Sequence, residues 1–279
     1  MKKLLILGSS GMAGHMILKY LTSLNKYAIF NVARTEVNEH TEIIDLETNR
    51  SRLRHYIEDI RPDFIINCVG VLVKPSADNP QRALWLNTEL PRWLANITEF
   101  THTKVIHLST DCVFSGENGP YKDTDKPDGK GRYAETKEMG EIINDRDLTI
   151  RMSIIGPELK ENGSGLFEWF MRQTKPLQGY KEVFWSGVTT LELAIAIDKL
   201  IPTNITGLIQ LAPSYSISKY DLLKTIAKVW NKDINIIPTS LVKHNKVLIP
   251  SEVKIPYYEM PNSYESMLLQ LKEFTECST

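Results

Sequence analysis

Three short segments of the chain place a tyrosine four residues before a lysine: YAETK (133–137), YSISK (215–219) and YDLLK (220–224). Where such a segment is helical, the two side chains lie on one face, one turn apart. The ammonium would then favour tyrosinate, lower the pKa of the phenol and ease proton exchange near neutral pH. Because the chain contains 11 tyrosines and many lysines, chance matches are expected, and the surrounding sequence must distinguish the three.

The segment at Tyr133 follows a second feature that could do chemistry. A short apolar run, predicted to be a buried strand, ends in Ser109, Thr110 and Asp111. Ligands of a parallel sheet bind beyond the carboxyl ends of its strands, where a hydroxyl can polarise a substrate carbonyl. Tyr133 and Lys137 are therefore predicted to transfer a proton beside Ser109 or Thr110, and the sequence leaves open which hydroxyl acts.

The other two tyrosine–lysine pairs lack this context. They lie beyond residue 210, with no glycine-rich turn ahead of them and no strand-end hydroxyl nearby. They fall at the start of a helix predicted over 218–230, for which Ser218 is the expected N-cap. We interpret the segments 215–219 and 220–224 as solvated or packing parts of a helix, with their tyrosine hydroxyls away from the site.

The first predicted strand, residues 4–7, ends in a glycine-rich turn, GSSGMAG. Gly8 can adopt the positive φ of a tight turn, Gly11 leaves room for a pyrophosphate, and Gly14 lets the next helix pack on the strand. The N-terminus of that helix would direct free N–H groups at the phosphates. The spacing GxxGxxG differs from the commoner GxGxxG, and the alternative is a turn required only for packing. The residues predicted to contact a dinucleotide here are Gly8, Ser10, Gly11, Met12 and Gly14.

The end of the second predicted strand, residues 28–32, bears on the choice of cofactor. An acidic residue there would bind the ribose 2′-hydroxyl of NAD, whereas arginine accommodates the 2′-phosphate of NADP. Arg34 and Thr35 stand at this point, so NADPH is favoured, and NADH is the other cofactor that the sequence allows. Asp45, after the third predicted strand, is a candidate contact for the adenine; the alternative is a carboxylate that caps the following turn.

Short apolar runs alternate with longer amphipathic stretches along the first half of the chain. Strands are predicted at 4–7, 28–32, 43–46, 64–68, 105–108, 149–155, 207–211 and 234–237, and helices at 12–23, 50–60, 82–99, 133–144, 190–201, 218–230 and 264–274. This alternation predicts an α/β fold, a doubly wound parallel sheet of the Rossmann type with helices on both faces. We predict an NAD(P)-binding domain over 1–156, to which 188–212 return, and a smaller C-terminal substrate-binding lobe from 157–187 and 213–279.

The composition narrows the choice of partners and location. The 279 residues carry a net charge of −1, and this lack of a basic surplus argues against nucleic acid or a membrane as a partner. Cys68, Cys112 and Cys277 are far apart and the six histidines are scattered, so no metal site is expected and a reducing compartment is favoured. No apolar run approaches the roughly 18 residues of a membrane span. We expect a cytoplasmic protein.

Several segments together carry a family resemblance. GSSGMAG, NCVG (67–70), STDCVFSG (109–116), YAETKEMGE (133–141) and IIGPE (154–158) resemble an extended short-chain dehydrogenase/reductase, and more narrowly the dTDP-4-dehydrorhamnose reductase family. The resemblance covers about the first 160 residues well and the remainder more loosely. It implies NAD(P)H-dependent reduction of a 4-keto group on a nucleotide-activated 6-deoxy sugar, in surface polysaccharide synthesis.

The resemblance also assigns roles to individual residues. It gives catalytic roles to Thr110, Tyr133 and Lys137, with Ser109 adjacent. Further cofactor-binding residues are Cys68, Val69 and Gly70, which would line the cleft through their backbone, and Asn87, which would help to order the site. Asp111 and Cys112 are expected to contact the substrate. The chain departs from the family at Cys112 and in a loop before Tyr133 that is about one residue shorter, which leaves open whether Ser109 or Thr110 acts. The family usually has an aromatic residue where Cys112 stands, and the Asp-Glu pair of sugar-nucleotide 4,6-dehydratases is absent, which favours reduction over elimination.

The segment 165–185 is a candidate contact for a nucleotide sugar. Trp169 or Trp185 could stack on the base, and Arg172, Lys175 and Lys181 could meet the diphosphate. The alternative is a helix whose apolar face packs on the core. Two other functions remain open: an epimerase of the same superfamily, and a non-catalytic NAD(P)-binding regulatory subunit. The sequence leaves open whether the chain forms a homodimer.

Overall fold

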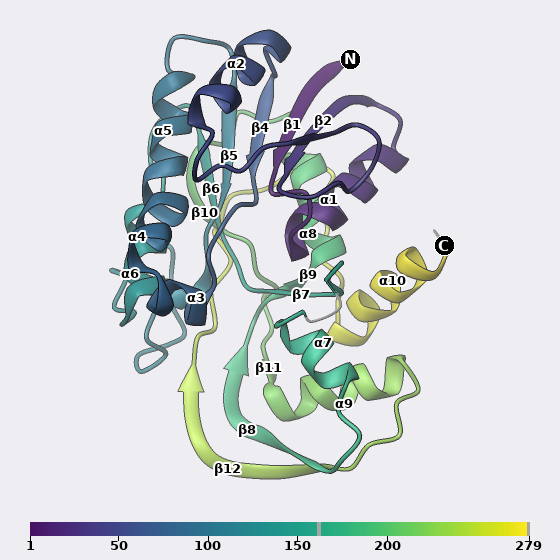
Figure 1. Cartoon of the computed structure of the whole chain (residues 1–279). Helices are drawn as coiled ribbons and strands as arrows, with labels where there is room; N and C mark the ends of the chain where they lie inside the picture. Colours follow the sequence, from purple (N-terminus) through teal and green to yellow (C-terminus); the bar gives the residue numbers. More distant parts are fainter. Residues whose placement is uncertain (161–162, 278–279) are drawn as a thin grey trace.

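A computed structural model describes residues 1–160 and 163–277. Its centre is a seven-stranded sheet in the order β10-β6-β5-β4-β1-β2-β3, and every neighbouring pair of strands is parallel (Figure 1). The strands are β1 (Lys2–Leu7), β2 (Tyr27–Ala33), β3 (Thr41–Ile43), β4 (Phe64–Asn67), β5 (Lys104–Leu108), β6 (Leu148–Arg151) and β10 (Gly207–Gln210). The predicted doubly wound parallel sheet is therefore confirmed.

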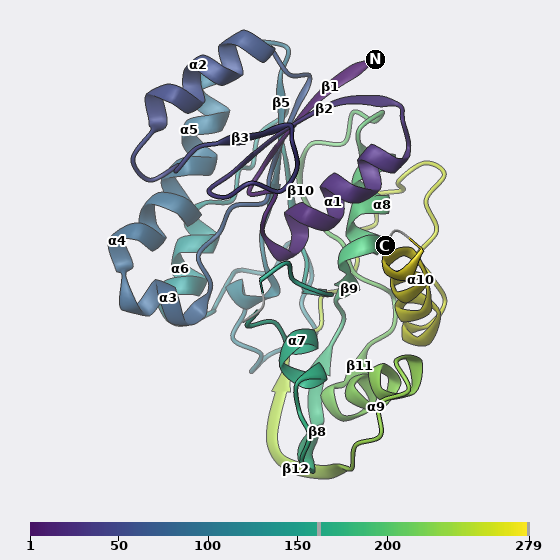
Figure 2. The same ribbon diagram turned by 45° about the vertical axis from the view of Figure 1, so that its right-hand side comes forward.

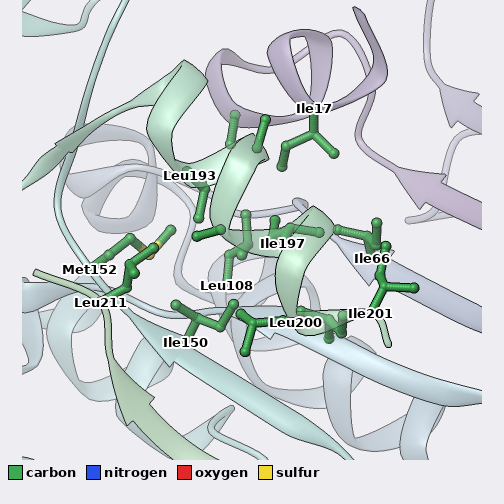
Figure 3. Packing of buried hydrophobic residues seen from close by; sticks show 14 of the residues in the cluster. Ile17, Ile66, Leu108, Ile150, Met152, Leu193, Ile197, Leu200, Ile201 and Leu211 are labelled. Carbon is green, nitrogen blue, oxygen red and sulfur yellow. The ribbon is translucent and has the colours of Figure 1, made fainter. Parts of the chain in front are cut away.

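Alternating side chains of the strands fill two separate cores. On one face, Leu4 and Ile6 of β1 pack against α1 (Met12–Ser23) and α8 (Thr190–Leu200). Figure 3 shows part of this cluster, with Ile66, Leu108 and Ile150 of the strands beneath helix α8. On the other face, Leu5 and Leu7 belong to a cluster with α2 (Arg50–Ile60) and α5 (Leu90–Ile97). Because both faces are covered, the strands are apolar on both sides and read as continuous hydrophobic runs.

A smaller lobe lies beyond the carboxyl edge of the large sheet (Figure 1). Its three-stranded sheet has the order β11-β8-β12, in which β11 is antiparallel and β12 parallel to β8. Figure 2 shows α7 and α9 packed beside these strands, with α10 alongside α8. The elements of this part of the chain are β7 (Ile154–Ile155), α7 (Leu166–Met171), β8 (Leu177–Trp185), β9 (Val188–Thr189), β11 (Ile217–Ser218), α9 (Lys219–Val229), β12 (Ile236–Asn245) and α10 (Tyr264–Glu276).

The predicted elements differ from the observed ones mainly near the second lobe. Strand β8 was not predicted, because its glycine and charged residues hide any alternation. The strand predicted at 149–155 is two strands, β6 and β7, interrupted at Met152. The short helix α3 (Val73–Asp78) was also not predicted, and β3 begins two residues before the predicted strand at 43–46.

Two other predicted helices differ from the observed ones, one in its internal geometry and one in the residue at which it ends. The helix predicted over 82–99 is made of α4 (Pro80–Ala83), a π-helical turn η1 (Leu84–Glu89) and α5. Pro91, which has no N–H to donate, lies directly after the π-helical turn. Helix α6 (Arg132–Met139) ends five residues before the predicted end of this helix at residue 144. Beyond its end, the side chain of Glu141 forms a buried ion pair with Arg151. Among the described residues, no helix is both long and apolar enough to cross a membrane.

The close approach of α1 to β1 gives a first testable prediction. A Cβ at Gly14 would lie 2.2 Å from the carbonyl oxygen of Gly8, which is backbone and cannot move aside cheaply. Gly14→Ala should lower the free energy of unfolding by about 2 kcal/mol, measured by chemical denaturation. Gly70→Ala is the control, since its Cβ would meet Asn87 Oδ1 at an ordinary 3.5 Å. Equal stability of the two variants would contradict this packing.

Candidate active site

The glycine-rich turn forms one wall of a cavity of about 390 Å³. Gly8 has a φ of +81°, as the tight turn after β1 requires. Helix α1 begins at Met12 with Gly11 as its N-cap, and no side chain caps its free N–H groups. An uncapped helix N-terminus beside a cavity is a site for phosphate. Gly8, Ser10 and Gly11 line the cavity, whereas Met12 and Gly14 lie in the helix behind it.

The opposite walls bring together most of the other predicted cofactor residues. Arg34 is exposed at the end of β2, and Asp45 follows β3. The Asp45 carboxylate also accepts a hydrogen bond from the N–H of Glu47 at 2.9 Å, so the alternative capping role is present as well. Cys68, Val69 and Gly70 follow β4 and complete this side of the cavity.

Four residues that the sequence did not single out line the cavity from the second lobe: Glu158, Lys160, Gly163 and Ser164. Glu158 also accepts a hydrogen bond from the N–H of Gly165 at 2.6 Å. The signal for Glu158 was present, since it ends the motif IIGPE. Glycines, an uncapped helix N-terminus, an arginine and a carboxylate around one cavity fit a dinucleotide.

Asn87 does not line this cavity, because its side chain is fully buried in η1. Its amide accepts a hydrogen bond from the N–H of Val71 at 2.8 Å and donates to the carbonyl of Val71 and to the hydroxyl of Thr136, both at 3.1 Å. Asn87 thus ties the loop after β4 to helix α6. The geometry favours a positioning role for Asn87 over the predicted direct contact with the cofactor.

Lys137 is buried beneath the loop after β4. Its Nζ donates to the carbonyl of Leu108 at 2.7 Å and lies 3.5 Å from Nε2 of His107. The other ring nitrogen of His107 contacts Asn67 at 3.1 Å. Burial lowers the pKa of His107 well below its usual value and that of Lys137 to about 8, while Glu141 and Cys68 oppose the shift at Lys137. Lys137 does not line the cavity, whereas Cys68, whose charge influences the pKa of Lys137, does.

Tyr133 lies at the start of α6 and shares a side-chain hydrogen bond with Thr110. Burial raises the pKa of Tyr133, the charges of Cys112 and Asp111 raise it further, and the hydrogen bond to Thr110 opposes them. The expected lowering of this pKa by Lys137 is wrong. The Lys137 ammonium instead donates a hydrogen bond to the carbonyl of Leu108 at the end of β5.

The two candidate hydroxyls after β5 point in different directions. Ser109 Oγ donates to Glu141 Oε1 at 2.7 Å, and that carboxylate forms a buried ion pair with Arg151, also at 2.7 Å. Thr110 Oγ1 instead accepts a hydrogen bond from the N–H of Cys112 at 3.1 Å and meets Tyr133. The structure therefore brings Thr110, and not Ser109, beside the tyrosine.

The residues predicted to contact a substrate are only partly brought together. Asp111 and Cys112 directly follow Thr110, and both influence the pKa of Tyr133. Trp169 and Arg172 are exposed on and after α7, where Arg172 donates a hydrogen bond to the carbonyl of Gly163, a residue of the cavity wall. Lys175 and Lys181 are also exposed. The exposed ring of Trp169 is accessible to a ligand.

Trp185 corrects the expected stacking on a base. Its side chain is only 4% exposed, and its indole nitrogen donates to Ser153 Oγ at 2.7 Å. The ring packs against Tyr264 and lies 4.8 Å from Nζ of Lys219. Its faces are thus occupied by side chains of the protein itself, and the packing alternative is the correct one for this residue.

The tyrosines of the other two tyrosine–lysine pairs lie away from the site, as predicted. The hydroxyl of Tyr215 donates to the carbonyl of Pro261, and the ring of Tyr220 carries Lys224 above it at 5.4 Å, so neither tyrosine is at the site. Lys219, however, lies close enough to Asp111 and Cys112 for their charges to influence its pKa. Lys219 is the first residue of α9 and packs over the ring of Trp185, which agrees with its interpretation as a packing part of a helix. The described residues contain no group of three histidine, cysteine or acidic side chains that could hold a metal.

A doubly wound parallel sheet, a glycine cradle after its first strand and a tyrosine–lysine pair after its fifth define an extended short-chain dehydrogenase/reductase. The model of one family within this class, described as the RmlD substrate binding domain, matches residues 1–248. The chain belongs to that family.

The proteins that this chain resembles carry names of different functions. Methionine adenosyltransferase 2 subunit beta of Bos taurus is 24% identical over 247 residues, which cover 82% of this chain and 72% of the relative. A crystal structure of a hypothetical dTDP-4-dehydrorhamnose reductase from Sulfolobus tokodaii is 25% identical, with a TM-score of 0.78 over 94% of this chain and 98% of that one. The dTDP-4-dehydrorhamnose reductase of Bacillus anthracis, solved in complex with NADP, has a TM-score of 0.83 at 21% identity, with 98% of each chain covered.

The buried amide of Asn87 gives the second prediction. Asn87→Leu removes three hydrogen bonds and leaves the backbone of Val71 unpaired in the interior, so the free energy of unfolding should fall by about 3 kcal/mol in chemical denaturation. Asn96→Leu, at an exposed position in α5, should stay within about 0.5 kcal/mol of wild type. If Asn87→Leu is no less stable than Asn96→Leu, the loop after β4 does not depend on this amide.

Proposed function

We propose that the protein is an NAD(P)H-dependent reductase of a 4-keto group on a nucleotide-activated 6-deoxy sugar, as in dTDP-4-dehydrorhamnose reductases, acting in surface polysaccharide synthesis. The observation that carries the proposal is the placement of Thr110, directly after β5, and Tyr133, at the start of α6, where the two side chains interact at the carboxyl edge of the sheet. At this edge, the Thr110 hydroxyl would polarise a substrate carbonyl and the Tyr133 hydroxyl would donate a proton to its oxygen. A protein that only bound a dinucleotide would have no need of this pair.

The residues around the cavity fit NADPH. The turn from Gly8 to Gly11 and the uncapped N-terminus of α1 would hold the pyrophosphate, and Arg34 would meet a 2′-phosphate. Arg34 makes no hydrogen bond or ion pair with the described part of the chain, and a nicotinamide dinucleotide would supply the hydride for the reduction. Binding of NADP by the Bacillus anthracis relative supports this choice.

The protein's own groups would orient the substrate and deliver the proton. Because the pKa of Tyr133 is raised, its phenol is protonated at neutral pH and can donate a proton to the oxygen that becomes an alcohol. The Thr110 hydroxyl would bind the same oxygen and keep it beside the phenol. Lys137, which is buried below the carboxyl end of β5, would bind the cofactor's ribose. Its pKa near 8 means that the ammonium is lost as the pH rises through that value.

The residues after Thr110 support plain reduction. Elimination across the sugar ring would need a second acid–base group beside Asp111, but the following residue is Cys112. Burial raises the pKa of the Cys112 thiol to about 11, so it is a neutral and weakly acidic group at physiological pH. It cannot replace the missing carboxylate.

A regulatory subunit that binds NAD(P) without turnover is the second candidate. Similarity to the beta subunit of a methionine adenosyltransferase over 82% of the chain favours it, because that name belongs to part of a different enzyme. A turnover assay distinguishes the two functions, because a reductase and a regulatory subunit would both bind the dinucleotide but only the reductase would oxidise it. An epimerase would interconvert sugar isomers with no net consumption of NADPH.

The third prediction concerns turnover by the purified protein. With a panel of dTDP- and UDP-linked 4-keto-6-deoxy sugars, it should oxidise NADPH, followed at 340 nm, and should prefer NADPH to NADH because of Arg34. Binding of NADPH without oxidation across the whole panel would favour the regulatory subunit. Isomerised sugar with NADPH intact would favour the epimerase.

The fourth prediction separates the three tyrosine–lysine pairs. Tyr133→Phe should lower kcat by about a thousandfold, because the proton donor is lost, and should leave the affinity for NADPH near wild type. Tyr220→Phe is the matched control on α9 and should keep the wild-type rate. If Tyr220→Phe were equally damaging, or Tyr133→Phe harmless, Tyr133 would not be the proton donor.

A further inference from the structure

Three buried polar side chains contact one another in a row behind the carboxyl edge of the sheet: Asn67, His107 and Lys137. Asn67 ends β4 and His107 lies in β5, and the register of these parallel strands sets the two residues side by side. Lys137 reaches them from α6. Asn67 and His107 are fully buried, and Lys137 is nearly so. Because these side chains are shielded from solvent, each must find its hydrogen-bond partners within the protein.

The backbone of the loop after β4 fixes the orientation of the Asn67 amide. The amide oxygen, Oδ1, accepts a hydrogen bond from the N–H of Val69 at 3.2 Å. A backbone N–H can only donate, so the oxygen must be the atom on this side and the NH2 group must be on the other. The amide nitrogen, Nδ2, lies 3.1 Å from Nδ1 of His107 and is therefore the donor to it.

This donor determines which nitrogen of His107 carries the proton. Because Nδ1 accepts from Asn67, the single proton of the neutral imidazole belongs on Nε2. Burial lowers the pKa of His107 well below its usual value, and the charge of Lys137 lowers it further, so the ring stays neutral at physiological pH. Nε2 is 3.5 Å from Nζ of Lys137. The lysine thus has an N–H group as its neighbour.

An ammonium is poorly placed beside this N–H, because it has three donors and no lone pair with which to accept. Within the described part of the chain, the carbonyl of Leu108, at 2.7 Å, is the one acceptor besides the His107 ring that Nζ of Lys137 meets. An uncharged amine fits both neighbours, since it can donate to Leu108 and accept from His107. Burial also favours the amine and lowers the pKa of Lys137 to about 8.

The acidic groups near Lys137 do little to hold its charge. Glu141 and Cys68 are the two whose charges favour the ammonium. The Glu141 carboxylate, however, forms a buried ion pair with Arg151 at 2.7 Å. Burial raises the pKa of the Cys68 thiol to about 12, so the thiol is uncharged at neutral pH. Neither group supplies an unpaired negative charge, and the contact with His107 gains weight accordingly.

We propose that Asn67 and His107 are positioning residues for Lys137: Asn67 fixes the tautomer of the imidazole, and the Nε2–H of His107 donates a hydrogen bond to Lys137 in its amine form. Lys137 then gains and loses its proton close to physiological pH and is not a permanent positive charge. The inference deepens the proposed function, on which its effect on turnover rests, but the hydrogen bonds themselves can be tested without substrate.

The first measurement is NMR spectroscopy of the full chain, free of dinucleotide, with isotope-labelled histidine and lysine. Long-range proton–nitrogen spectra identify the tautomer of His107, and a pH titration follows the Cε carbon of Lys137. His107→Gln and Lys137→Met assign the two signals. We expect a neutral imidazole with its proton on Nε2, and a Lys137 signal that titrates with a pKa of about 8.

The second measurement uses Asn67→Asp, which keeps the size of the side chain. A carboxylate still accepts from Val69, but it presents an oxygen to His107 in place of the NH2 group. The imidazole should move its proton to Nδ1 and offer a bare Nε2 to the lysine. The pKa of Lys137 should then rise by about one pH unit or more, and the alkaline limb of the pH profile of kcat should rise with it. Asn96→Asp, exposed in α5, is the control and should change neither.

The tautomer decides the outcome. A proton on Nδ1, or on both nitrogens, of wild-type His107 at neutral pH overturns the inference, and this result needs no variant. If Asn67→Asp is folded by thermal melting and still carries a proton on Nε2, Asn67 does not fix the tautomer and the inference is likewise overturned, even where the added charge raises the pKa of Lys137. If the expected tautomers are found but no sugar of the panel is reduced, the proposed function fails and the hydrogen bonds stand.

Discussion

The register between parallel strands is the constraint on which the site depends. Leu7 of β1 pairs with Asn67 of β4, and Asn67 pairs with His107 of β5, so the three strands end side by side. The segments after these strands must then emerge at one edge: the glycine turn, the loop from Cys68, and Thr110. Residues a hundred positions apart thus meet because of backbone hydrogen bonds, before any of their side chains interact.

Behind that edge, a buried polar network holds the parts in place. Asn87 joins the loop after β4 to α6, and α6 carries both Tyr133 and Lys137. Lys137 binds the end of β5, while the Glu141–Arg151 ion pair fixes Ser109 on the far side. Each of these groups would be costly to bury alone, and together they are satisfied, which favours a single arrangement of the site over many.

The features that could be predicted from the sequence are those set by interactions between residues close together in the chain. The glycine turn, the helix at 12–23 and the parallel sheet follow from spacing and periodicity, and the structure has the helix at the same residues. Which of Ser109 and Thr110 faces Tyr133 could not be predicted, because the answer depends on where Glu141 lies.

The central claim is that Thr110, and not Ser109, works with Tyr133 on the substrate. The most direct measurement is kcat for NADPH-dependent reduction by Thr110→Val and Ser109→Ala, with thermal melting to confirm folding. The geometry predicts a loss of about a hundredfold or more for Thr110→Val, since a group that stabilises the reacting oxygen is removed, and less than about tenfold for Ser109→Ala. A severe loss in Ser109→Ala together with near wild-type turnover in Thr110→Val would contradict the account.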